Sequence, residues 1–166
     1  MNPHEALRQQ YNAALQMLRV AITECPDSLW TDASYPNQFW HIAYHALFFT
    51  NFYLQPSESD FALWPGHRPD YLFLGTTLPW RPNDPPKIGA PYSKQEVLEC
   101  HEFCVHVVEA KLPSLDLNLP SGFHWVPGDK LELQIYSLRH LSHHTGQLID
   151  RLRTKVGKGV PWLVRG

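Results

Sequence analysis

Cysteine is scarce in this chain, which holds three cysteines among 166 residues. Small secreted domains that depend on disulfides carry a denser, usually even set, so a disulfide framework is excluded as the basis of this fold. Cys100 and Cys104 instead have the spacing of neighbours on one helix face. The pattern favours a reducing compartment.

Long apolar runs are also missing. No uncharged stretch approaches the roughly 20 apolar residues that a membrane-spanning helix needs. The N-terminal residues, Met1 to Glu5, lack a basic stretch followed by an apolar segment, so the sequence predicts no signal peptide. We therefore expect a cytoplasmic protein without a membrane partner.

Positive charge is not in excess either. Fourteen Lys and Arg against sixteen Asp and Glu give a formal net charge of -2. Because such a chain offers no basic field for phosphates, nucleic acid is excluded as an expected partner. The abundant residues are aromatic and imidazole side chains: six Trp, seven Tyr, eight Phe and ten His. They predict a heavily aromatic interior and draw attention to the histidines.

The apolar periodicity predicts four long helices. The first begins at an Asn2 cap, the second runs from about Asn37 to Leu54, and the third starts at the capping box of Ser93 and Glu96. The last covers Leu131 to Val156 behind an Asp129 cap. Together they predict an all-α protein, a single domain over residues 1–166, folded as a four-helix bundle.

A long crossover, residues 55–92, separates the second and third helices. Its prolines, spread from Pro56 to Pro91, forbid a helix through the segment. Its apolar side chains, Tyr71 and Trp80 among them, need something to pack against, so we expect the segment to cover the bundle and line a pocket. The tail after the last helix is expected to pack through Trp162.

Five polar residues of the crossover are candidates for contacting a substrate, although each is also explained as a solvated loop residue. They are Glu58, Asp60, His67, Arg68 and Asp70.

The last helix carries His140 and His144 at positions i and i+4, with Gln147 and Arg151 continuing their row. Two imidazoles one turn apart can reach the same metal ion. Each can equally be a packed or solvated residue, so the pair alone does not establish a site. A third ligand from a facing helix would close it, as happens in bundle cores.

The second helix offers that ligand, because it carries His41 and His45 and is otherwise apolar almost all round. Burying an imidazole there is costly unless each ring nitrogen finds a partner, either a metal or a backbone carbonyl. Cys100, His101 and Cys104 on the third helix are also ligand types. We favour a structural role for them, since a buried Cys behaves as a small hydrophobe.

The last helix contains a pattern formed by His140, His143, His144, Gly146 and Gln147. Together with the aromatic-rich second helix that carries a His, this pattern resembles the DinB-like (DinB/YfiT-like) superfamily of metal-dependent proteins. The resemblance covers nearly the whole chain in element order. This chain has Thr145 where the family often has Arg.

The resemblance implies a divalent metal, nickel or zinc, held by one His of the second helix and the pair of the last. Counting back from Phe52-Tyr53-Leu54 selects His45, with His41 as reserve or as a supporting group. His143 and Gln147 are expected to support the ligands. Separately, Gly146 is expected to let a neighbouring helix approach closely.

Three neutral imidazoles leave a coordination position open and suit zinc, nickel, copper or iron better than magnesium or calcium. Such a metal lowers the pKa of a bound water or thiol, so hydrolysis and thiol transfer are both chemically available. The resemblance favours a thiol S-transferase that uses a low-molecular-weight thiol. No general base is identified; His41, Glu58 and Asp60 are the candidates.

Two alternatives remain open at this point. The first is a non-catalytic bundle that binds a metal or small ligand, for example in stress response. The second is a helical bundle whose histidines have no shared role and which forms a homodimer through an apolar face. Metal titration of the apo protein separates the last alternative from the others.

Overall fold

The computed structural model describes residues 2–78 and 81–166 of the chain. Their regular elements are helical: α1 (Pro3–Glu24), α2 (Asp27–Trp30), α3 (Phe39–Tyr53), α4 (Lys94–Lys111), the 3-10 turn η1 (Leu112–Ser114) and α5 (Lys130–Val156). Within these residues only isolated β-bridges occur, without a strand. The all-α prediction is confirmed.

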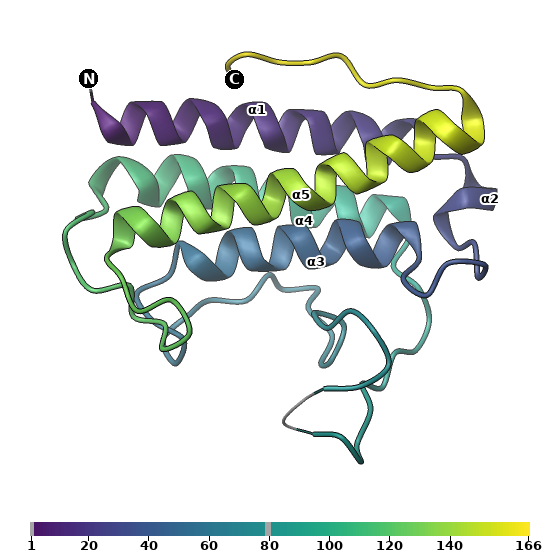
Figure 1. Cartoon of the computed structure of the whole chain (residues 1–166), viewed down its shortest axis with the longest axis horizontal. Helices are drawn as coiled ribbons and strands as arrows, with labels where there is room; N and C mark the ends of the chain where they lie inside the picture. Colours follow the sequence, from purple (N-terminus) through teal and green to yellow (C-terminus); the bar gives the residue numbers. More distant parts are fainter. Residues whose placement is uncertain (1, 79–80) are drawn as a thin grey trace.

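The four long helices lie roughly side by side (Figure 1). α3 packs against α5 and α4, and α1 packs against the same two helices. The predicted helices therefore all exist, and each lies between two others. The sequence reading missed the short α2, which follows the Pro26 that ends α1. No described helix is both long and apolar enough to cross a bilayer.

The predicted caps are confirmed because each one satisfies a backbone N–H that the first helical turn leaves free. The Asn2 side chain accepts from the His4 N–H, and Asp129 accepts from the Glu132 N–H. Ser93 and Glu96 form the reciprocal capping box of α4. These caps set where the long helices begin.

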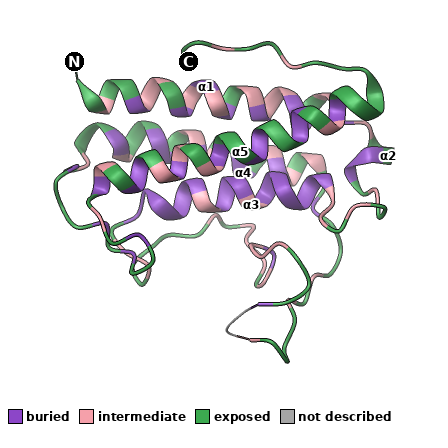
Figure 2. Cartoon of the chain, viewed as in Figure 1, coloured by how far each residue is buried: buried purple, intermediate pink, exposed green. Residues whose placement is uncertain are grey.

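α3 is the most deeply embedded helix, and Figure 2 shows it buried almost throughout. Of its fifteen residues thirteen are buried. The two exceptions are His45 and Phe49, which stand one turn apart on the same face. That face is therefore the one place where α3 is not fully covered by packed side chains.

The crossover from Gln55 to Ser93 contains no helix in its described residues, as predicted. It lies along the outer side of α3 (Figure 1). Two imidazoles of α3 are hydrogen-bonded to it, because the backbone oxygens of Tyr71 and Leu72 accept from His41 and His45. Tyr71 is buried, as expected, whereas Trp80 lies outside the described residues.

Two minor predictions are wrong. Trp162 does not anchor the tail, since its side chain is 78% exposed. Val160 packs against the core instead, and the Gly166 N–H donates to the Gln9 carbonyl over 3.2 Å. Gly146 does not serve a close helix approach, because a Cβ at this position would meet no atom within 4 Å. Its lack of a side chain has no packing reason here.

Candidate metal centre

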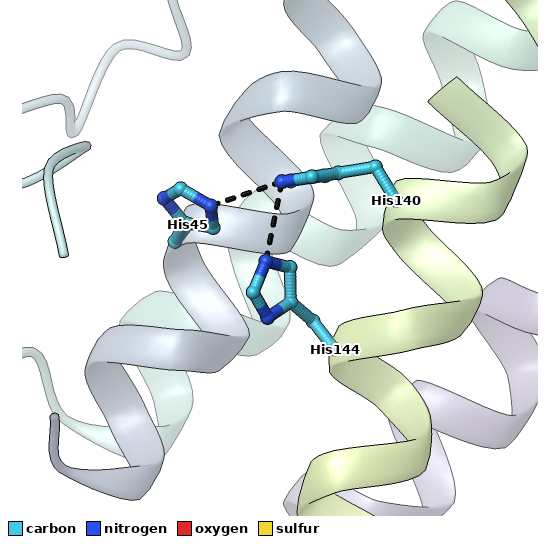
Figure 3. Close-up of side chains that lie close together, drawn as sticks. All are labelled: His45, His140 and His144. Carbon is cyan, nitrogen blue, oxygen red and sulfur yellow. Dashed lines mark hydrogen bonds between the residues drawn. The ribbon is translucent and has the colours of Figure 1, made fainter. Parts of the chain in front are cut away.

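His45, His140 and His144 meet between α3 and α5 (Figure 3). The Nε2 atoms of His45 and His140 are 3.0 Å apart, and those of His144 and His140 are 3.2 Å apart. All three residues offer ligand atoms within 4.8 Å of one another. The structure thus brings together the three histidines that the sequence reading selected.

Local helix geometry explains the convergence. On α5, His140 and His144 are one turn apart and so share a face, while Leu141, Leu148 and Leu152 are fully buried and hold the helix against the core. On α3, His45 occupies the partly exposed face that borders α5. The pair on one helix and the single residue on the other therefore face each other across one interface.

Hydrogen bonds orient two of the rings. His45 Nδ1 donates to the Leu72 carbonyl over 2.7 Å, since a carbonyl oxygen can only accept. His144 Nδ1 donates to Gln147 Oε1 over 2.8 Å. A neutral imidazole with its proton on Nδ1 has a free lone pair on Nε2. Both Nε2 lone pairs consequently point into the cluster, which is the arrangement that metal-binding histidines adopt.

His140 completes the cluster, but it cannot donate a hydrogen bond to both of the other rings. Its Nε2 faces the Nε2 atoms of both other rings, and its Nδ1 is buried without a hydrogen-bond partner. One Nε2–H can serve only one of two acceptors well, so at least one buried lone pair is left without a proton. A buried polar atom without a partner is costly, and a cation shared by the three nitrogens would remove that cost.

Burial keeps these imidazoles neutral. It lowers the pKa of His45 to about 3 and that of His140 to about 4, with the neighbouring imidazoles adding to the shift. Burial also lowers the pKa of His144, although its hydrogen bond with Gln147 opposes the shift. Because a metal ligand must be deprotonated, the cluster does not have to release protons near neutral pH before binding an ion.

The donor set fits a transition metal. Zinc–nitrogen bonds of about 2.0–2.1 Å in a tetrahedron place the nitrogens about 3.3 Å apart, close to the 3.0 and 3.2 Å observed. Three neutral nitrogens suit zinc or nickel and do not suit magnesium or calcium, which prefer oxygen. With three protein ligands, a position stays free for a small molecule.

The supporting residues divide into two groups. Gln147 contacts a ligand ring directly, whereas His143 is exposed and its ring lies 5.0 Å from that of His144. His41 does not join the cluster, since its Nε2 donates to the Tyr71 carbonyl over 2.9 Å and its ring stacks on Trp40. The choice of His45 over His41 therefore agrees with the geometry.

The polar candidates of the crossover are paired elsewhere. Glu58 accepts from His124, Asp70 pairs with Arg81, and Arg68 pairs with Glu96. His67 Nδ1 accepts from the Tyr44 hydroxyl over 2.6 Å. Asp60 is exposed. None of these residues belongs to the three-histidine cluster.

Sequence reasoning missed two contributors, Leu72 and Phe49. Leu72 acts through its carbonyl, and a backbone acceptor leaves no mark in the sequence. Phe49 contacts both His45 and His140, with ring centroids 4.8 and 5.4 Å away. Its position one turn after His45 could have revealed it, because residues four apart share a helix face.

Comparison of the chain with family models, curated proteins and solved structures gives no match. The three-histidine cluster is therefore interpreted from its own geometry.

Proposed function

We propose that the protein is a DinB-like, metal-dependent protein in which His45, His140 and His144 bind one divalent transition metal, zinc or nickel. One observation carries the proposal: three Nε2 atoms from two helices converge, while two of the Nδ1 atoms are held by acceptors outside the cluster. The order of the long helices and the long crossover agree with the four-helix bundle that this proposal implies.

We further propose that the centre acts on a small molecule, as a thiol S-transferase with a low-molecular-weight thiol or as a hydrolase, in the cytoplasm. A metal with three neutral nitrogen ligands supplies Lewis acidity that favours the deprotonated form of a thiol or water. The chain contributes the rest. Leu72 and Gln147 fix two imidazoles, and the Phe49 ring covers one side of the cluster.

A non-catalytic binding protein is the second candidate, and one observation favours it. Among the described residues, the hydrogen bonds of the three imidazoles involve carbonyl, amide and imidazole groups and no carboxylate. A site without an attached base can hold a metal or small ligand without turning it over. Glu58 and Asp60, the acidic candidates, lie outside the cluster.

Two experiments test these proposals in turn. Protein purified without a His tag should contain close to one zinc or nickel per chain, and a His144→Ala variant should contain none. Turnover of thiol and electrophile pairs, or of small esters, should disappear with a chelator and return with added metal. A metal-loaded protein with no turnover of either class would favour the binding role, and a wild type without metal would refute both.

Self-association is proposed separately. A homodimer would cover exposed apolar side chains such as Ile135 and Trp162, which are 56% and 78% exposed. Sedimentation equilibrium should give a dimer mass. A monomer at high micromolar concentration would contradict the homodimer and leave the metal proposal unaffected.

A further inference from the structure

A cavity of about 750 Å³ adjoins the three histidines and has no part in holding a metal. Four aromatic side chains of α3 form its floor: Phe48, Phe49, Phe52 and Tyr53. Phe61 of the crossover and Trp125 of the segment before α5 close its other side. The volume lies within the range of roughly 300–1,000 Å³ typical of small-molecule sites. We call this space the aromatic chamber.

The aromatic chamber and the histidine cluster share walls. Phe49 lines the chamber and also contacts the rings of His45 and His140. Leu72 lines the chamber too, and its carbonyl accepts the His45 hydrogen bond. Phe49 and Leu72 therefore form the shared wall between a ligand in the chamber and the imidazoles.

The polar groups of the aromatic chamber are already paired with each other. His124 Nδ1 lies 2.8 Å from Glu58 Oε2, and Trp125 Nε1 donates to the Tyr53 hydroxyl over 3.3 Å. The Glu58 and His124 side chains are 38% and 77% exposed, so this pair lies toward solvent. The remaining lining is apolar and offers a ligand no unpaired charge.

Aromatic rings dominate that lining from separate parts of the chain. Phe61 meets Phe52 edge to face with centroids 4.7 Å apart, and Trp125 contacts the same ring at 6.3 Å. Phe61 and Trp125 are still 36% and 43% exposed. When a flat apolar ligand covers such side chains, it removes their apolar surface from water and stacks on their rings, which favours binding.

We propose that the aromatic chamber binds a neutral, planar aromatic group of one or two rings and presents its substituent to the three-histidine centre. The substrate class is thus an aromatic compound with a small polar or electrophilic substituent. The binding step rests on the aromatic chamber alone. Only the presentation step rests on the proposed metal function, so the two can fail separately.

The binding step is tested with 2-naphthol and chelator-treated protein by isothermal titration calorimetry. We expect saturable binding with one site. Phe61→Ala and Trp125→Ala should each weaken it about tenfold, the value of one lost aromatic contact. Both side chains are partly exposed, so the variants should fold, which circular dichroism checks. Trp162→Ala is the matched control, since Trp162 lines a different groove and its loss should change nothing.

The presentation step is tested with 2-naphthalenethiol on zinc-loaded and chelated protein. Zinc should strengthen 2-naphthalenethiol binding at least about 100-fold and 2-naphthol binding much less, because zinc binds a thiolate in preference to a hydroxyl group, and His144→Ala should abolish the gain. Absence of 2-naphthol binding, or wild-type affinity in both Phe61→Ala and Trp125→Ala, would overturn the aromatic chamber. Naphthol binding without a zinc-dependent gain for the thiol would overturn the presentation step. Naphthol binding by a protein that takes up no zinc would support the chamber and refute the metal function.

Discussion

Two helix interfaces in this protein carry side chains that bind transition metals in other proteins. Between α3 and α5 lie His45, His140 and His144, whose Nε2 atoms face one another. On α4, Cys104 donates to the Leu47 carbonyl of α3, and His101 donates to the Leu15 carbonyl of α1. The α4 side chains donate to separate backbone acceptors. His101 Nδ1 is buried without a partner, as His140 Nδ1 is, but among the described residues no further ligand atoms converge on it.

The two interfaces also differ in protonation. Burial lowers the pKa of His45 and His140, so their imidazoles are neutral and ready to bind a cation. Burial raises the pKa of Cys100 well above its usual range, so this thiol keeps its proton and is a poor ligand. Ligand-type residues at helical spacing therefore make a candidate site only where deprotonated ligand atoms converge.

The largest expected effect comes from removing a converging nitrogen. His45→Ala, His140→Ala and His144→Ala should each lower zinc affinity by more than about 100-fold. Losing a residue that only hydrogen-bonds a ligand costs less, roughly 10–100-fold. Competition with a chromophoric chelator measures the affinity. His143→Ala is the matched control, because His143 is exposed on the same helix.

Two results for zinc affinity would contradict the distinction between the two interfaces. Equal loss of zinc affinity in His143→Ala and His144→Ala would mean that convergence in the structure does not select the ligands. Loss of affinity in Cys104→Ala, with no loss in His144→Ala, would place the ion at α4 instead.

The next effect concerns acid and the buried His101 of the α4 interface. Burial lowers the pKa of His101, so below the ordinary pKa of about 6.5 the unfolded chain takes up a proton that the folded chain refuses. In metal-free protein the free energy of unfolding should therefore fall as pH falls below about 6.5. His101 contributes up to about 1.4 kcal/mol per pH unit until its lowered folded pKa is reached.

Urea denaturation between pH 7.5 and 5 measures this slope. His101→Gln removes the titrating group and should flatten the slope by that amount, while zinc affinity at pH 7.5 stays at the wild-type value. An unchanged slope in the variant would show that His101 is protonated in the folded state. That result would contradict the neutral, buried imidazole that the structure assigns to His101.

A smaller effect is expected at the amide that orients His144. Gln147→Ala removes the acceptor of His144 Nδ1 and should lower zinc affinity about tenfold, the low end for an outer partner, because Gln147 is exposed and water can replace it. Gln147→Glu keeps an acceptor and should restore the affinity. Wild-type affinity in Gln147→Ala would show that the ring needs no orientation.

The smallest effect tests a helix position beside the cluster. Gly146 lies inside α5, and an added Cβ would meet nothing within 4 Å. Gly146→Ala should therefore raise the free energy of unfolding by about 0.5–1 kcal/mol, the usual helix preference of alanine over glycine. Thermal denaturation measures the change. A loss of stability would mean that a close contact exists at this position after all.

Much of the fold was predictable because its signals are local. The caps at Asn2, Ser93 and Asp129 and the apolar periodicity define where the long helices begin. The pair on α5 was equally visible, since i and i+4 spacing fixes two side chains on one face. Each of these features depends on residues within one helical turn and not on distant parts of the chain.

The remainder depended on contacts between distant segments. His41 and His45 share a helix face and both donate to the crossover, and only the fold shows that His45 also faces His140 of α5. The Leu72 carbonyl and the aromatic chamber arise where the crossover lies on α3. Trp162 is the largest apolar side chain of the tail, but Val160 and a backbone hydrogen bond of Gly166 hold the tail, which composition does not reveal.

Zinc K-edge X-ray absorption on protein loaded with one equivalent of zinc tests the central claim most directly. The structure predicts three imidazole nitrogens at about 2.0–2.1 Å and one further light atom, with the imidazole signal reduced in His140→Ala. Sulfur scattering at about 2.3 Å would place the ion at the cysteines of α4. That result, or an imidazole signal unchanged in His140→Ala, would contradict the assignment of the three-histidine centre.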